Sequence, residues 1–220
     1  MKALFIKDWK LLKNQGKMFG AVLVFYGLLA IMDNSMGQSI LGFFPFLFGL
    51  FTISTISYDE YQHGMTYLMT LPIKRKTYVT EKYLFAMALA GAGSLLILIL
   101  ELLYHVIRHR AMTEVVMWEI LSSTCFMIPV VILFLALALP LNLKFGSEKG
   151  RSLFSGMMLA IFFLGIIGAK KLKGSLLLEQ IQSLLQAKGL LLVLVGILIY
   201  ALVLVISYRI SVRIIEKREF

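Results

Sequence analysis

The stretch WEILSSTCFMIPVVILFLALAL, Trp118–Leu139, contains one charged residue, Glu119, and is otherwise apolar or small. About 20 mostly apolar residues are enough for an α-helix to cross the hydrocarbon core of a bilayer. The stretch therefore predicts a membrane-spanning helix. It also holds the chain's single cysteine, Cys125, for which a packing role is expected because no internal disulfide can form.

The composition of the whole chain indicates the same environment. Of the 220 residues, 60% are hydrophobic and 15% are charged, whereas soluble domains have about 45–50% and about 25%. A soluble fold of this length has too little interior to bury that much apolar surface. The chain is therefore expected to be an integral membrane protein with almost no room for a separate soluble domain.

Five further apolar runs predict five further spanning helices. The first run is short, but the Lys17 side chain can extend to the membrane surface and so lengthen its reach. We expect an all-α integral membrane protein with six transmembrane helices in a single transmembrane domain, residues 1–220. The predicted spans are about 18–32, 39–57, 84–104, 118–139, 152–169 and 189–208.

Basic residues mark one side of the membrane. If the N-terminus is cytoplasmic, most of the 22 Lys and Arg residues fall in cytoplasmic segments, as the positive-inside rule requires. We therefore expect a multi-pass protein with both termini in the cytoplasm. The loop with Lys170, Lys171, Lys173 and Lys188 departs from this pattern, because it would lie outside. These short clusters account for the net charge of +10, so no nucleic-acid partner is expected.

Enzyme motifs are absent from the sequence. It contains no G-x-S-x-G, no H-E-x-x-H and no G-x-x-x-x-G-K-[ST] pattern. Without the last of these, the P-loop, the chain cannot cradle a nucleotide phosphate in that way. We therefore expect no enzymatic activity and no cofactor in this chain, and any ATP-driven function would need an ATPase from another polypeptide.

Glu101, His105 and His109 recur every four residues and would share one face of a helix near the outer surface. Histidine and carboxylate are suitable zinc ligands. The alternative is a polar helix end that meets water, with Glu101 paired to Arg108 or to the histidines. We favour this alternative and predict no metal. Glu119 lies at a similar depth and, with the other three, is a candidate for an outer vestibule.

The connection between the second and third predicted spans, Tyr58–Tyr83, is longer than the two to eight residues usual between packed helices. Its first half places Tyr58, Tyr61, Met65 and Leu68 on one helical face. Leu71-Pro72 then ends the helix, because the residue before proline disfavours helical geometry. Such a helix can lie in the lipid headgroups or dock into a partner protein. The acids at its start favour a protein partner.

This segment resembles a known family. The stretch SYDEYQHGMTYLMTLPIKRKTYVTEKYL, residues 57–84, is similar to the acidic-aromatic, T-L-P-I-x-R-K and K-Y-L pattern of small six-span ABC exporter permeases of the type-2 class from Gram-positive bacteria, such as phenol-soluble-modulin and bacteriocin exporters. Lys74 departs from the pattern, which commonly has Ser or Thr there. The matching residues are Tyr58, Asp59, Glu60, Leu71, Pro72, Ile73, Arg75, Lys76, Lys82, Tyr83 and Leu84.

The resemblance implies that residues 58–83 hold a coupling helix, which inserts into a groove of a cytoplasmic P-loop ATPase. ATP and Mg²⁺ would bind to that partner, and a second permease chain, identical or different, would face this one in a bacterial plasma membrane. The opening MKALFIKDWKLLKN, within residues 1–17, is similar to the family's interfacial helix along the inner membrane surface. The implied ATPase contacts are Tyr58, Asp59, Glu60, Tyr61, Met65 and Leu68. Lys74, Arg75 and Lys76 would meet lipid phosphates or acidic ATPase residues, or only fix the topology.

By the same resemblance, the second and fifth spans would line the translocation path. Their aromatic and methionine side chains adapt to amphipathic cargo, although they are also ordinary lipid-facing residues. The favoured function is therefore export of an amphipathic or antimicrobial-type peptide. The alternative is a stand-alone membrane channel, scaffold or immunity protein without an ATPase. The path candidates are Phe43, Phe44, Phe48, Phe51, Phe154, Met157 and Phe162.

Overall fold

The computed structural model describes the backbone of residues 1–17, 20–21, 24–25, 44–61, 64–107, 113–172 and 176–218. These residues form helices and connecting turns and contain no strand, which confirms the all-α prediction for this part of the chain. The helices are α1 (Lys2–Asn14), α4 (Phe44–Glu60), α5 (Gly64–Thr70), α6 (Arg75–Ile107), α7 (Glu114–Leu172) and α8 (Leu176–Lys217).

Three segments of the described helices are long and apolar enough to cross a membrane: Arg75–Val106, Glu114–Gly146 and Val193–Lys217. They contain all or most of the predicted spans 84–104, 118–139 and 189–208. The span predicted at 18–32 lies largely outside the described residues, as does the beginning of the span at 39–57, whose remainder forms α4. The total of six spans therefore stays a prediction.

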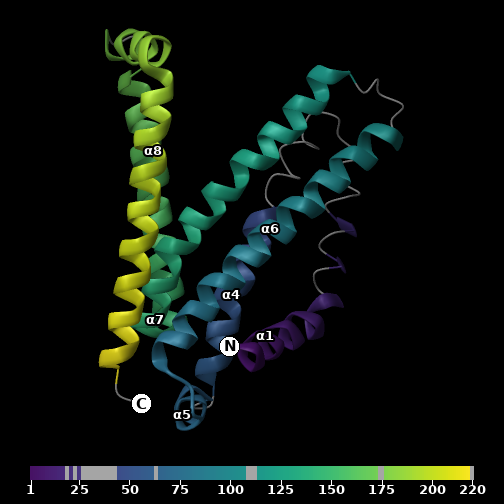
Figure 1. Ribbon diagram of the computed structural model, residues 1–220, viewed down its shortest axis with the longest axis vertical. Helices are drawn as coiled ribbons and strands as arrows, with labels where there is room; N and C mark the ends of the chain where they lie inside the picture. Colours follow the sequence, from purple (N-terminus) through teal and green to yellow (C-terminus); the bar gives the residue numbers. More distant parts are fainter. Residues whose placement is uncertain are drawn as a thin grey trace.

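Helix α7 consists of two helical segments that meet at Gly146. This residue has φ 80° and ψ 172°, a backbone conformation that is essentially restricted to glycine. Figure 1 shows the first segment descending beside α6 and the second rising next to α8. The connection predicted between the fourth and fifth spans is thus a sharp reversal at one glycine.

The hydrophobic core lies at the end of the bundle where α5 is found. Fully buried residues from four helices meet there, among them Ile56, Val79, Leu139 and Ile215. Away from this end the α6 and α8 ribbons diverge, and α1 lies crosswise beneath α4 and α6 (Figure 1). The chain is therefore most tightly packed where α5 and the C-terminal end of α8 meet the other helices.

The reversal in α7 generates a test of packing. A Cβ atom at Gly150 would lie 2.8 Å from the Asn142 Cα atom across the turn, so Gly150→Ala must push the two segments of α7 apart. We expect a loss of about 1–3 kcal/mol in the free energy of unfolding, measured as a lower thermal midpoint in detergent. Gly156→Ala is the matched control, because nothing lies within 4 Å of its added Cβ and alanine favours helix by up to about 1 kcal/mol. Equal midpoints for the two variants would contradict the close approach.

Candidate functional site

The connection between α4 and α6 is more compact than the sequence predicts. Helix α4 continues to Glu60, α5 begins at Gly64, and α6 already begins at Arg75. The predicted single amphipathic helix is therefore divided between two elements. The physical reason is that the chain folds back on the end of α4: a Cβ at Gly64 would lie 2.9 Å from the Asp59 carbonyl oxygen, which only glycine tolerates.

The two sides of the α5 region differ in character. Met65 and Leu68 are buried and pack into the core. In contrast, Tyr61 and Tyr67 are 69% and 72% exposed, and Leu71, just after α5, is also exposed. We call Tyr61, Tyr67 and Leu71 the outer α5 surface. Because α5 lies at the tip of the bundle (Figure 1), this surface is presented outward on a helix whose opposite side is fixed by apolar packing.

Tyr58 is half exposed at the end of α4, next to this surface. Its hydroxyl oxygen accepts a 2.7 Å hydrogen bond from the Gln15 side chain, just beyond the end of α1. Of the six residues that the resemblance implied as ATPase contacts, Tyr58 and Tyr61 are thus exposed, whereas Met65 and Leu68 face the interior.

A group of buried charges lies directly behind the α5 region. We call Lys7, Asp8, Asp59 and Lys82 the buried ion cluster. The Lys82 side chain has no exposed surface, and its ammonium nitrogen lies 2.5 Å from an Asp8 oxygen and 2.9 Å from an Asp59 oxygen. It also donates a 2.9 Å hydrogen bond to the Thr55 hydroxyl. Lys82 on α6 is therefore bound to α1 and α4 at once.

Further contacts link these charges to one another and to Tyr78. Lys7 forms an ion pair with the other Asp59 oxygen and lies 3.3 Å from Asp8, and the Tyr78 hydroxyl donates to Asp59 at 3.0 Å. Burial raises the pKa of the Asp59 carboxyl, but the ammonium groups of Lys82 and Lys7 more than offset this, so its pKa lies below its usual range. Two ammonium groups thus pair with the Asp8 and Asp59 carboxylates in a site where unpaired charge is very unfavourable. A third buried carboxyl, Glu81, lies beside the cluster, and neither of its oxygens has a hydrogen-bond partner among the described residues.

The sequence does not reveal this cluster: the resemblance implies an ATPase contact for Asp59, and no sequence pattern gives Asp8 a role. One signal was present: Asp8 is the one acid among the basic residues of the first 17 positions. Its partner Lys82 is 74 positions away, a distance over which a single sequence does not reveal pairing.

A second set of polar contacts joins the α5 region to the C-terminal end of α8. Glu60 pairs with Arg218 at 2.8 Å, and Arg218 also donates to the Leu143 carbonyl just before the α7 reversal. The Arg75 guanidinium donates to the carbonyls of Ile215 and Glu216. Since these carbonyls lie in the last turn of α8, Arg75 supplies hydrogen bonds that this helix end lacks. Glu60 and Arg75 therefore have partners within the chain.

The other two members of the predicted basic group, Lys74 and Lys76, are exposed. The Lys76 ammonium lies 4.0 Å from a Glu216 carboxylate oxygen, and both side chains are open to solvent, so this pair adds little stability.

The three outer-vestibule candidates that the structure describes do not form one cluster. Glu101 and His105 are buried near the far end of α6, where His105 Nδ1 lies 3.0 Å from the Glu101 carbonyl oxygen, a contact within one helix turn. Glu119 on α7 is exposed, and His109 lies outside the described residues. Among the residues that the structure describes, no group of three or more His, Cys, Asp or Glu side chains is positioned to hold a metal.

Several path candidates fill the interior of this single chain. Phe51 is buried with Phe85 and Leu89. Phe154 is buried and forms an edge-to-face contact with Phe134, with ring centroids 4.6 Å apart. Phe48 and Met157 are half-buried against the same clusters. Phe43 lies outside the described residues, and only the backbone is described at Phe44 and Phe162.

Comparison with known proteins gives one informative result. The model of the family described as "ABC-2 family transporter protein" matches residues 3–216, a range that begins in α1 and ends in the last turn of α8. No curated protein and no solved structure matches the chain.

The buried ion cluster generates a test of stability. Lys82→Met keeps the apolar stem but leaves only the Lys7 ammonium to compensate the Asp8 and Asp59 carboxylates, so we expect a loss of about 3–5 kcal/mol in the free energy of unfolding. Lys76→Met, at an exposed pair, is the control and should cost no more than about 1 kcal/mol. Adding Asp8→Asn to Lys82→Met should restore part of the lost stability, measured by thermal unfolding in detergent. Similar losses for Lys82→Met and Lys76→Met would show that the cluster does not hold these helices together.

Proposed function

The chain belongs to the ABC-2 transporter family and is a membrane permease component of an ABC transporter, and we propose that it binds a separate ATPase through the outer α5 surface. Family membership implies an ATPase partner in general terms. The observation that carries the proposal is the division of the α5 region into a buried apolar side and an exposed aromatic side.

The outer α5 surface has the chemistry of a protein-binding site. Tyrosine is enriched among the residues that dominate interface energies, because it combines a large apolar area with one hydrogen-bonding group. Tyr61 presents such a group just after α4 and Tyr67 presents one on α5, with the exposed Leu71 following α5. In this proposal Met65 and Leu68 hold the helix in place rather than contact the ATPase.

The packing behind the outer α5 surface supports a role in transmitting motion. Asp59, two residues before Tyr61, belongs to the buried ion cluster that joins α1, α4 and α6. Glu60 is tied to Arg218 at the end of α8. A displacement of α5 by a nucleotide-driven partner would therefore be passed to four helices together. The energy for that displacement comes from contacts that differ between the nucleotide states of the partner.

Charge at this end of the bundle supports a cytoplasmic location for α5. Exposed basic residues from two helices and one turn gather there, and such residues are concentrated on the cytoplasmic side of membrane proteins. In this orientation the described N-terminal helix and the C-terminal end of α8 are also cytoplasmic. The basic residues are Lys74, Lys76, Arg209, Arg213 and Lys217.

For the cargo and the assembly we retain the expectation drawn from the resemblance: export of an amphipathic peptide from a bacterial cell by two permease chains and two ATPases that bind ATP and Mg²⁺. Because Phe51 and Phe154 fill the core of one chain, the path in this proposal is lined by other surfaces. The broad apolar face of α8, which includes Leu194, Leu198 and Leu202, is exposed in the single chain and is available to lipid or to a second permease.

The proposal is tested by binding of the ATPase encoded next to this chain's gene. Tyr61→Ala combined with Tyr67→Ala removes both exposed rings without touching the core, and we expect the dissociation constant for the ATPase to rise at least about tenfold. Trp118→Ala is the control, because Trp118 is 67% exposed at the opposite end of the α7 span. The readouts are co-purification and stimulation of ATP hydrolysis by the permease. Unchanged binding and stimulation in the double variant would remove the outer α5 surface from the interface, and the absence of any associated ATPase would favour the stand-alone alternative.

A further inference from the structure

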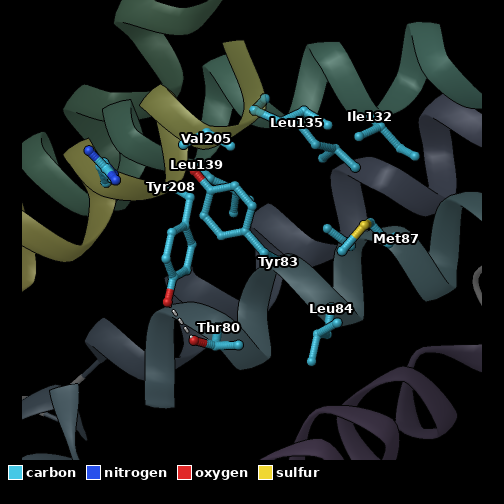
Figure 2. Close-up of a pocket in the computed structure, with 13 residues that line it drawn as sticks. Thr80, Tyr83, Leu84, Met87, Ile132, Leu135, Leu139, Val205 and Tyr208 are labelled. Atoms are coloured by element: carbon cyan, nitrogen blue, oxygen red, sulfur yellow. Dashed lines mark hydrogen bonds between the residues drawn. The ribbon is translucent and has the colours of Figure 1, made fainter. Parts of the chain in front are cut away.

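A cavity of about 470 Å³ lies between α6, α7 and α8 (Figure 2), and no residue of the outer α5 surface or of the buried ion cluster lines it. Leu84 and Met87 line it from α6, Ile132 and Leu135 from α7, and Val205 from α8. Its volume is within the range of about 300–1,000 Å³ that is typical of ligand sites.

The hydroxyl groups on the cavity wall already have partners. The Tyr83 hydroxyl is hydrogen bonded to Ser207 and Ser211 at 2.6 and 2.9 Å, and the Tyr208 hydroxyl to Thr80 at 2.9 Å (Figure 2). A polar ligand would lose its hydrogen bonds to water on entering such an apolar space, which is unfavourable. A hydrocarbon chain makes no hydrogen bonds to water and so loses none on entering, and the cavity therefore favours a hydrocarbon ligand.

Positive charge begins at the edge of this cavity. Arg209 lines the cavity and also lines a neighbouring hollow of about 500 Å³ on α8, together with Arg213 and Lys217. These three residues recur every four positions and so follow one face of the helix over about 12 Å. In the described part of the chain none of the three forms an ion pair, since Glu216, the acid between them, lies against Lys76.

We propose that the cavity binds an acyl chain of one anionic phospholipid, whose phosphate group contacts Arg209 and Arg213. The apolar wall and the unpaired guanidinium groups are adjacent, which matches a molecule with a hydrocarbon tail and a negative head. A zwitterionic lipid provides no net charge for the arginines, and free phosphate provides no tail for the cavity. The bound lipid would bridge α6 and α8 close to the point where they diverge.

The test uses the full chain, delipidated in detergent and titrated with phosphatidylglycerol, with bound lipid counted by native mass spectrometry. Val205→Trp and Met87→Trp place an indole in the cavity at half-exposed positions, and each should weaken lipid binding at least about tenfold. Leu198→Trp is the matched control: Leu198 lies two turns from Val205 on the same face of α8 and lines neither hollow. Its binding should equal that of the unmodified chain.

Removal of charge tests the headgroup contact separately. Arg209→Gln and Arg213→Gln should each weaken binding about fivefold, the factor that corresponds to about 1 kcal/mol for one basic side chain near an anionic lipid. Lys149→Gln, at an exposed lysine on the second segment of α7, should have no effect. A photoactivatable acyl chain should label residues 84–87 and 204–208.

Four results would overturn the proposal: unchanged lipid binding in both tryptophan variants, equal binding of phosphatidylcholine, equal binding of glycerol phosphate without acyl chains, or labelling away from these two segments. None of these measurements involves an ATPase, so the lipid site and the proposed ATPase contact succeed or fail independently.

Discussion

The ion pairs of Lys82 hold together the end of the bundle where α5 lies. A lysine with no exposed surface is stable only if its charge is matched, and here Asp8 and Asp59 provide the match from two other helices. This requirement fixes the position of α1 beneath α4 and α6 more specifically than apolar packing would. It also fixes the end of α4, because moving Asp59 out of the cluster would leave Lys82 and Lys7 without one of their carboxylate partners. The turn into α5, and thus the outer α5 surface, begins two residues later.

The reversal of α7 at Gly146 gives the bundle its shape. Because the chain turns back within a few residues, the first segment of α7 ends next to the point where the second begins. The core forms where the two segments meet α4, α6 and α8. Gly150 allows the second segment to approach Asn142 closely on the other side of the turn. Beyond this point α6 and α8 separate (Figure 1), and the apolar cavity with Arg209 at its edge lies near the beginning of that separation.

Sequence reasoning predicted the apolar spans of α6, α8 and the first segment of α7, because long apolar runs are sufficient to define them. It also identified the α4–α6 connection as the segment that resembles ABC exporter permeases. The family match over residues 3–216 is consistent with that resemblance. Sequence reasoning did not predict which face of α5 is buried: the spacing of Met65 and Leu68 relative to Tyr58 and Tyr61 defines a stripe, but tertiary packing decides what the stripe contacts. It matched Lys82 to the family pattern but did not pair it with Asp8, because a charge that looks solvent-exposed in the sequence becomes a core residue only through a partner far along the chain.

The contrast between the two ends of the bundle has a mechanical consequence for the proposed exporter. A close-packed core transmits displacement with little compression, so a push on α5 moves the connected helix ends together rather than deforming them. Helix α6, with 33 residues, is about 50 Å long, and a rotation of about 5° at its packed end would move its far end by about 4 Å over that length. A small motion at the outer α5 surface is therefore amplified at the opposite face of the membrane. A lipid held between α6 and α8 would lie near the pivot of this motion. There it would oppose or favour separation of the two helices while itself moving little.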